Sequence, residues 1–299
     1  MPLPKELRRY EGKGLAPAGQ VVQSRDRTGV YLADQELAVA VNTALVIEQP
    51  LLCTGEPGTG KTALAWSVAS ELGLGPPLTF HTRSDHQSRD VLYSFDHLLR
   101  YYHAQVHDPR AQDPSNYVQF QALGQAIRSD VPRLVLIDEI DKAPRDFPND
   151  LLNEIDQMEF TVRETGQCFK ARHRPIVILT SNSEHQLPDA FLRRCVFHHI
   201  EFPGPDHLLA ILRERLMDLN PQENLLKVAI TRFLELREVA GLEKPPAPSE
   251  LIQWVRLLLR AGVELRQLEA TPLRELEFVG TLIKTRHDRA KLRGGISPR

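Results

Sequence analysis

Eight residues with the spacing G-x-x-x-x-G-K-T, at positions 55–62, have the chemistry to bind a phosphate group. They follow the apolar run 51–54 and lead directly into a helical pattern. Glycines in such a loop allow positive φ angles and let the backbone come close to a ligand. The loop's N–H groups and the N-terminus of the following helix then form an anion site. The spacing therefore predicts a P-loop that binds a nucleoside triphosphate.

Two side chains of this loop can contact the phosphates and a metal ion. Lys61 is placed to reach the β- and γ-phosphates, and the hydroxyl of Thr62 is placed to bind Mg²⁺. We therefore predict that the nucleotide is bound by Gly55, Gly58, Thr59, Gly60, Lys61, Thr62 and Ala63.

A second apolar run, 134–137, ends in two adjacent carboxylates. Asp138 can hold Mg²⁺, directly or through water, opposite Thr62. Glu139 points elsewhere on the pleat and can polarise an attacking water, which favours hydrolysis over binding alone. A solvated acidic turn after a strand would look similar, but a P-loop in the same chain favours the catalytic interpretation.

Three further residues are candidates for the reaction. Asn182 follows the apolar run 176–180 and could orient water near the γ-phosphate, although Asn is also common in turns. Arg193 and Arg194 end a short helical pattern. An arginine that contacts the γ-phosphate stabilises the charge of the transition state, whereas a pair of surface arginines is an equally good interpretation of the sequence alone.

The elements that position these residues alternate between strand and helix. Five runs have strand character: 50–54, 78–81, 134–137, 176–180 and 196–202. This alternation predicts an α/β fold with a parallel sheet that is buried on both faces. After residue 203 the periodicity is helical, over 208–219, 225–239, 249–262 and 271–289. We predict an α/β nucleotide-binding domain at 1–203 and an all-α lid domain at 204–299.

Two segments are long for connections in a compact α/β domain. Residues 91–127 carry a helical pattern of their own, and residues 160–172 have the pattern of a β-hairpin. Long ordered insertions of this kind are usually functional. We therefore expect both to be surfaces for a partner.

Composition excludes several classes of protein. The 299 residues have a net charge of −2, which gives no global reason to expect nucleic-acid binding. No apolar run approaches the ~18 residues that span a bilayer, and the opening residues 1–6 lack the apolar segment of a secretory signal. The three cysteines are far apart, as in a protein with reduced thiols. These features predict a cytoplasmic protein without a membrane span.

Together, these motifs resemble the AAA+ ATPase superfamily. Residues 55–62 match its Walker A motif, 134–139 match Walker B, Asn182 matches sensor 1, and Arg193 or Arg194 matches the arginine finger. The two insertions are similar to those of the helix-2-insert and pre-sensor-hairpin group, in particular MoxR-type ATPases. The resemblance implies a five-stranded parallel sheet of order 5-1-4-3-2, ATP and Mg²⁺ as ligands, and a homo-oligomeric ring, usually hexameric. It also implies a finger that acts on the neighbouring subunit's nucleotide and a chaperone-like role, often beside a protein with a von Willebrand A domain.

One position departs from the family pattern. The lid arginine that senses the nucleotide should lie near the start of the helix after the proline-rich connector 244–248. Glu250 stands about where that arginine would fall, and Arg256 is one and a half turns later. The sequence leaves open which residue, if either, takes this role.

Other P-loop classes fit less well. A helicase needs a second α/β lobe, a transporter ATPase needs an LSGGQ-like signature, and a switch GTPase needs an N-K-x-D motif; none is present. Two alternatives stay open. One is an ATP-driven remodeller of a protein complex. The other is a nucleic-acid-directed motor or restriction subunit, in which the basic residues near the hairpin, Arg163, Lys170, Arg172 and Arg174, would contact DNA or RNA.

Overall fold

The computed structural model describes residues 10–13, 31–182 and 187–294, and the chain divides into two compact units. The first consists of residues 1–55 and 61–200, and the second of residues 201–299 together with the loop 56–60. The opening residues 1–6, used above in the prediction of location, lie outside the described residues. Within the described part of the chain, no helix has the length and apolar character needed to cross a membrane.

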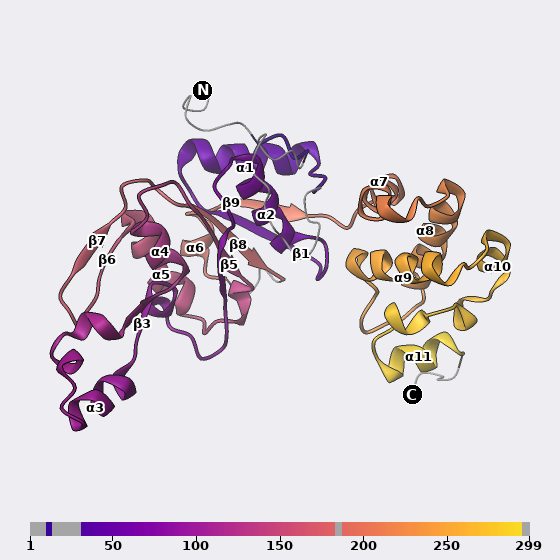
Figure 1. Cartoon of the computed structure of the whole chain (residues 1–299). Coiled ribbons are helices and arrows are strands. Elements are labelled where there is room, and N and C mark those ends of the chain that lie inside the picture. The colour runs from indigo at the N-terminus through magenta and orange to yellow at the C-terminus, as the bar shows by residue number, and fades with distance from the viewer. Residues whose placement is uncertain (1–9, 14–30, 183–186, 295–299) are drawn as a thin grey trace. The chain divides into compact units, whose positions relative to one another are not determined.

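A five-stranded parallel sheet forms the centre of the first unit (Figure 1). Its strands are β1 (Leu51–Gly55), β2 (Leu78–His81), β5 (Leu134–Asp138), β8 (Ile176–Ser181) and β9 (Val196–Ile200). They lie in the order β2-β5-β8-β1-β9. These labels differ from the predicted 5-1-4-3-2, because four strands of the insertions also take numbers along the chain. Counted over the sheet alone, the order is 2-3-4-1-5, which is 5-1-4-3-2 from the opposite edge.

The two faces of the sheet are buried under different helices (Figure 1). Because side chains alternate along a strand, Leu134 and Leu136 of β5 face one side, and Val135 and Ile137 face the other. The first pair packs with α1 (Gln35–Ile47) and α2 (Lys61–Glu71). The second pair packs with α4 (Ala122–Ile127) and α5 (Phe147–Gln157). Burial on both faces explains why β5 has a continuous apolar run rather than an alternating pattern.

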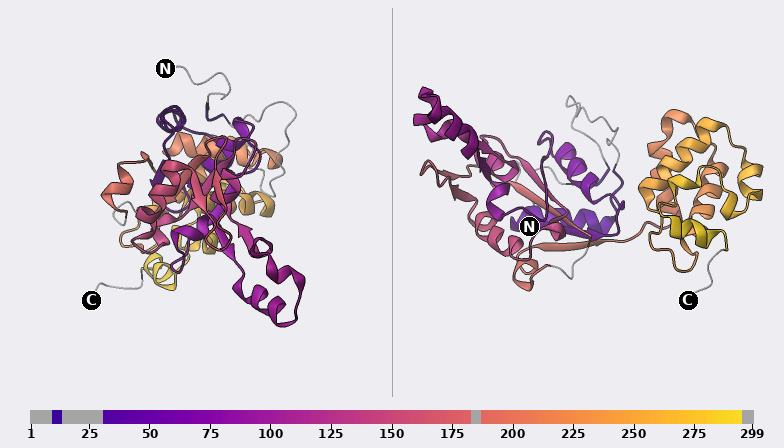
Figure 2. Two further views of the ribbon diagram at one scale, coloured as in Figure 1. Left: turned by 90° about the vertical axis from the view of Figure 1, so that its left-hand side faces the viewer. Right: turned by 90° about the horizontal axis from the view of Figure 1, so that it is seen from below.

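The first insertion contains an antiparallel ribbon that the sequence did not reveal. Strands β3 (Tyr93–Phe95) and β4 (Val118–Phe120) pair with each other and carry α3 (His97–Gln105) between them. Each strand has three residues, which is too short for a recognisable alternation of apolar and polar residues. Figures 1 and 2 show α3 at the end of an arm that extends away from the sheet.

The second insertion is the hairpin that the sequence predicted. It is formed by β6 (Glu159–Thr161) and β7 (Cys168–Lys170), which pair antiparallel with Phe160 opposite Phe169. Both rings contact Phe120 of β4, with centroids 6.2 Å and 5.4 Å away. The aromatic contacts therefore join the two insertions into one structure.

The second unit is helical and has its own core. Its helices are α7 (Pro205–Arg215), α8 (Glu223–Arg237), α9 (Pro248–Ala261), α10 (Leu265–Ala270) and α11 (Arg286–Leu292). Trp254 of α9 is fully buried at the centre of this core, and its Nε1–H donates to the carbonyl oxygen of Glu277 at 2.8 Å. A buried indole that keeps a hydrogen bond avoids the cost of an unpaired polar group.

The predicted helix over 271–289 was wrong. Only α11 forms a regular α-helix in that range, preceded by two short 3₁₀ turns at Leu273–Glu275 and Val279–Thr281. Pro272 has φ and ψ angles of −59° and 149°, an extended conformation in which a helix does not continue. Phe278 has a φ angle of 54°, which is incompatible with a right-handed helix. Apolar spacing alone did not reveal these two breaks.

Candidate functional site

The carboxyl ends of three neighbouring parallel strands bring the predicted residues together. Strands β1, β8 and β5 are adjacent, so Gly55, Ser181 and Asp138 end at one edge of the sheet. In open parallel sheets, ligands bind at this edge because the loops that follow the strands gather there. The topology thus accounts for the proximity of segments that lie more than 120 residues apart in the sequence.

The predicted P-loop lies between β1 and α2. All five residues of β1 are buried, and α2 begins at Lys61, directly after the loop. Gly58 and Gly60 have φ angles of 79° and 98°, in the region that favours glycine. The sequence of the loop has glycine at both positions, as these backbone angles favour.

Lys61 is buried at the start of α2. Its ammonium group donates to the carbonyl oxygen of Gly55 at 2.7 Å. Burial lowers the pKa of this ammonium group, while the nearby carboxylates of Asp141 and Asp138 favour the charged form. The side chain is thus held next to the loop by a contact that a phosphate oxygen could replace.

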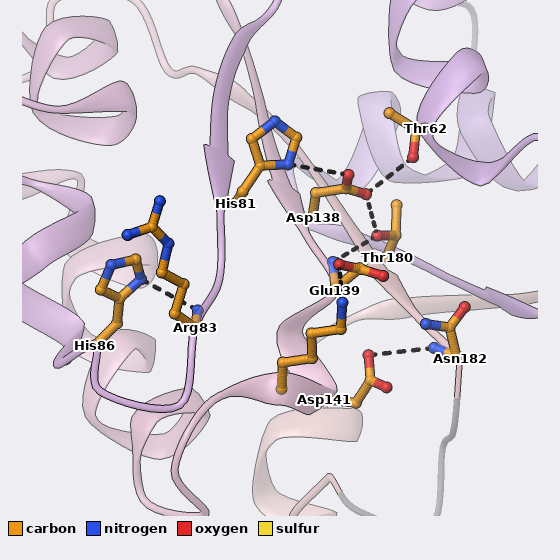
Figure 3. Close-up of polar contacts among 10 residues, drawn as sticks. Thr62, His81, Arg83, His86, Asp138, Glu139, Asp141, Thr180 and Asn182 are labelled. Atoms are coloured by element: carbon orange, nitrogen blue, oxygen red, sulfur yellow. Dashed lines mark hydrogen bonds and ion pairs between the residues drawn. The ribbon is translucent and has the colours of Figure 1, made fainter. Parts of the chain in front are cut away.

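Asp138 is the centre of a hydrogen-bonded cluster (Figure 3). Its Oδ1 accepts from the hydroxyl of Thr62 at 3.0 Å and from the hydroxyl of Thr180 at 2.6 Å. Its Oδ2 lies 3.3 Å from Nδ1 of His81, at the end of β2. The structure therefore brings together Thr62 and Asp138, the two residues predicted to hold Mg²⁺.

The donor chemistry of this pair fits Mg²⁺. The ion prefers oxygen ligands and usually binds through one or two carboxylates, water and the phosphates of a substrate. Thr62 and Asp138 offer a hydroxyl and a carboxylate that already contact each other. Over residues 10–13, 31–182 and 187–294, no group of three or more His, Cys, Asp or Glu side chains forms a metal cage.

Glu139 leaves the strand in an unusual backbone conformation. Its φ and ψ angles are 57° and 51°, the left-handed region, which costs a non-glycine residue about 1–2 kcal/mol. Its N–H donates to the Thr180 hydroxyl at 2.8 Å. Its carboxylate pairs with the ammonium of Lys142 at 2.5 Å, and this hydrogen bond raises the pKa of Lys142. Strain held by specific contacts is typical of functional sites.

Asn182 lies beside this cluster, at the end of β8. Its N–H donates to Oδ1 of Asp141 at 3.2 Å, and Figure 3 shows the two residues next to each other. Its side chain is exposed, as a residue that contacts a ligand from solvent must be. Asn182 therefore contacts the turn that follows Asp138 and Glu139.

The predicted arginines lie outside this cluster. Both are exposed after the short helix α6 (Asp189–Leu192), and Arg194 pairs with Asp156 of α5 at 3.3 Å. In the described part of the chain, neither forms a hydrogen bond or ion pair with Asp138 or Glu139. Both arginine side chains are therefore on the surface and outside the cluster around Asp138.

The two lid candidates are both engaged within the helical unit. Glu250 accepts from the N–H of Ala247 at 2.8 Å and so caps its own helix, α9. Arg256 donates to the carbonyl oxygen of Arg215 in α7 at 3.1 Å. These contacts give each side chain a structural role in the second unit.

Sequence reasoning missed three members of the cluster: His81, Lys142 and Thr180. The rule that parallel strands end at one edge could have indicated His81, the last residue of β2. Thr180 is a hydroxyl at the end of an apolar strand, and Lys142 is three residues after Glu139. Their contacts depend on strand pairing and on a turn whose geometry is not visible in the sequence.

Two solved structures align with this chain at low structural and sequence similarity. The FIGL-1 AAA domain, solved in complex with ADP, is 16% identical with a TM-score of 0.40, over 84% of this chain and 72% of that one. A RuvB mutant from Thermotoga maritima is 14% identical with a TM-score of 0.42, over 78% of this chain and 70% of that one. Neither likeness is close enough to support an argument about this chain.

No curated protein matches the chain. A family model described as "ATPase family associated with various cellular activities (AAA)" matches residues 51–204, just over half of the 299 residues. The matched range includes β1, the P-loop, Asp138, Glu139 and Asn182. The chain therefore belongs to the AAA family of ATPases.

Proposed function

We propose that this chain is a Mg²⁺-dependent ATPase of the MoxR type within the AAA+ superfamily, and that it uses ATP hydrolysis to remodel or activate a partner protein complex. The observation that carries the proposal is the cluster that joins Thr62, Asp138, Thr180 and Glu139 beside the P-loop. The Asp138 carboxylate and the Thr62 hydroxyl suit a metal ion, and the next residue, Glu139, has a second carboxylate that can act on water.

The P-loop residues bind and orient the triphosphate in this proposal. The loop's N–H groups and the N-terminus of α2 contact phosphate oxygens, and Lys61 exchanges its bond to Gly55 for one to the phosphates. Thr62 and Asp138 would hold Mg²⁺, which when bound neutralises charge that develops on the phosphate oxygens.

Glu139 and Asn182 act on the attacking water. The Glu139 carboxylate accepts a proton from the water as the water oxygen bonds to the γ-phosphorus, and Asn182 orients the water. The bond between the γ-phosphorus and the β-γ bridging oxygen breaks in the same reaction, and ADP leaves with that oxygen. Lys142 now holds that carboxylate, so Glu139 must exchange this ion pair for a hydrogen bond to water. Because Lys142 and Glu139 are both partly exposed, the exchange costs little free energy.

Arg193 and Arg194 suggest that the site needs a second subunit. Both side chains are exposed, as an arginine that serves a neighbouring subunit's nucleotide must be. We propose a homo-oligomeric ring, with six subunits as the family resemblance implies, in which one of them is the arginine finger.

The charges near the hairpin favour a protein partner over nucleic acid. Lys170 pairs with Glu159 at 3.0 Å, and Arg172 pairs with Asp130 at 2.5 Å. Arg174 donates to the carbonyl oxygens of Glu48, Ile155 and Asp156. The carboxylates of Glu159 and Asp130 offset the charges of Lys170 and Arg172, so these residues attract a phosphate backbone less strongly. A client with a von Willebrand A domain is the protein partner that the resemblance to MoxR-type proteins suggests.

Substitution of Glu139 tests the proposal directly. We expect Glu139→Gln to bind a fluorescent ATP analogue with wild-type affinity and to release phosphate ~10²–10⁴-fold more slowly, because a general base is lost. Lys61→Ala should lose nucleotide binding. Glu159→Gln is a matched control, since it makes the same chemical change at a partly exposed ion pair on the hairpin.

The outcomes separate the alternatives. Wild-type phosphate release by Glu139→Gln, or wild-type ATP affinity in Lys61→Ala, would contradict the assigned roles. Addition of DNA or RNA at low salt should leave the ATPase rate unchanged. A stimulation that disappears as salt is raised would instead support the nucleic-acid motor.

A further inference from the structure

Thr180 is a buried polar residue near the end of strand β8, after the four apolar residues 176–179, and the reaction described above does not use it. Its side chain is 1% exposed. A hydroxyl that is removed from water is costly unless it forms hydrogen bonds. Thr180 forms two, and both are to residues of the proposed catalytic pair, Asp138 and Glu139.

The direction of these bonds is fixed by chemistry. An ionised carboxylate only accepts, so the single proton of the Thr180 hydroxyl is donated to Oδ1 of Asp138, at 2.6 Å. The oxygen lone pairs then accept the N–H of Glu139, at 2.8 Å. One hydroxyl therefore holds both the carboxylate of one residue and the backbone of the next.

The second bond acts at the point where the chain leaves the sheet. Glu139 has a left-handed backbone, and the side chain of Thr180 in β8 accepts a hydrogen bond from its N–H. Strand pairing places Thr180 there, since Leu179 lies opposite Ile137 in the parallel register of β8 and β5. The sheet thus fixes where the Glu139 side chain starts.

We propose that Thr180 is a positioning residue, whose hydroxyl fixes the Asp138 carboxylate and the Glu139 backbone relative to each other. The residue that binds the metal ion and the residue that activates water are then held at a fixed distance. This inference rests on the proposed function, because it assigns Thr180 a role in that same site. Thr180 acts through its two neighbours and has no contact of its own with the reacting atoms.

The test compares three substitutions of Thr180. Thr180→Val keeps the shape and the β-branch but removes the hydroxyl, Thr180→Ser keeps the hydroxyl, and Thr180→Ala removes both. The matched control is Thr54→Val on β1, where another buried hydroxyl is lost, one that contacts Nδ1 of His199 at 2.9 Å. Each full-length variant is measured for phosphate release and for binding of a fluorescent ATP analogue, over a titration of Mg²⁺ and in EDTA.

We expect Thr180→Val to lower kcat by about 10–100-fold and to raise the Mg²⁺ concentration at half-saturation by a similar factor, as loss of an outer partner of a metal ligand does. Nucleotide affinity in EDTA should stay at the wild-type value, because the P-loop and Lys61 are untouched. Thr180→Ser should keep kcat and the Mg²⁺ concentration at half-saturation close to their wild-type values. Thr54→Val should lose stability without a change in Mg²⁺ dependence.

Equal Mg²⁺ dependence in Thr180→Val and Thr54→Val would overturn the role of Thr180 and leave the ATPase proposal intact. If Thr180→Val does not fold, the comparison is made between Thr180→Ser and Thr180→Ala. Equal Mg²⁺ concentrations at half-saturation in those two variants would also overturn the role of Thr180. A wild-type protein with neither ATP hydrolysis nor Mg²⁺-dependent nucleotide binding would overturn both proposals.

Discussion

The three cysteines differ enough in environment to test the sheet that positions the site. Cys53 lies on β1 and is 0% exposed, between Thr180 of β8 and His198 of β9 in the strand register. Cys168 is exposed on the hairpin, and Cys195 is partly buried before β9. We predict that iodoacetamide at pH 8 modifies Cys168 rapidly and leaves Cys53 unmodified while the protein is folded.

The expected difference follows from burial. Removal from water raises the pKa of the Cys53 thiol from 9.0 to about 12, although the charge of Lys61 opposes the shift. At pH 8 the reactive thiolate then falls from about one tenth of the population to about 10⁻⁴, a loss of roughly a thousandfold. Burial also raises the pKa of Cys195 to about 12, and the charge of Asp156 adds to the shift. Burial also blocks access of iodoacetamide to Cys53 and Cys195, which slows the modification of both thiols further.

Mass spectrometry of acid-quenched time points gives the rate at each cysteine. Cys168→Ser should remove the fast phase, and all three thiols should react at comparable rates in guanidinium chloride. Modification of Cys53 at the rate of Cys168 in native buffer, with folding verified by circular dichroism, would refute the buried position of β1. That result would also remove the basis for the P-loop geometry, because the loop starts where β1 ends.

Two further predictions concern the arginines and alkaline pH. If Arg193 or Arg194 acts on a neighbour's nucleotide, its alanine variant should regain ATPase activity when mixed with Lys61→Ala, above the sum of the two measured alone. An unchanged rate, with mixed assembly verified, would argue against action between subunits. The raised Cys53 pKa stabilises the fold fully below pH ~9 and loses this effect as pH rises toward 12, since the unfolded thiol ionises first. In urea denaturation the difference in unfolding free energy between wild type and Cys53→Ala should therefore shift against the wild type by roughly 1.4 kcal/mol between pH 8 and pH 10. A constant difference would contradict the assigned burial.

Signals that are local in sequence were enough to predict the residues at the centre of the candidate site. The run 134–137 is apolar at every position because β5 is buried on both faces, and its next two residues are the carboxylates Asp138 and Glu139. Gly58 and Gly60 mark backbone angles that other residues avoid. In each case the physical requirement acts on consecutive residues, so the sequence shows it directly.

Contacts between residues that are distant in the chain could not be predicted from the sequence in the same way. Thr180 reaches Asp138 across 42 positions in the chain, and its role depends on the register of β8 against β5. A shift of one residue in that register would turn Thr180 to the other face of the sheet. The break in the helical pattern at Phe278 is a local conformation, yet phenylalanine is not a residue type that signals a positive φ angle.

The end of strand β8 and the residue that follows it contact the turn 138–141, the turn proposed above to be catalytic, at two points. Thr180 is the next-to-last residue of β8, and Asn182 directly follows the end of that strand at Ser181. Thr180 contacts Asp138 and Glu139 at the start of the turn, and the N–H of Asn182 contacts Asp141 at its end. Any movement of the end of β8 must therefore shift both carboxylates. Because Asn182 is also the residue proposed to orient the attacking water, the position of the water and that of Glu139 depend on the same strand end.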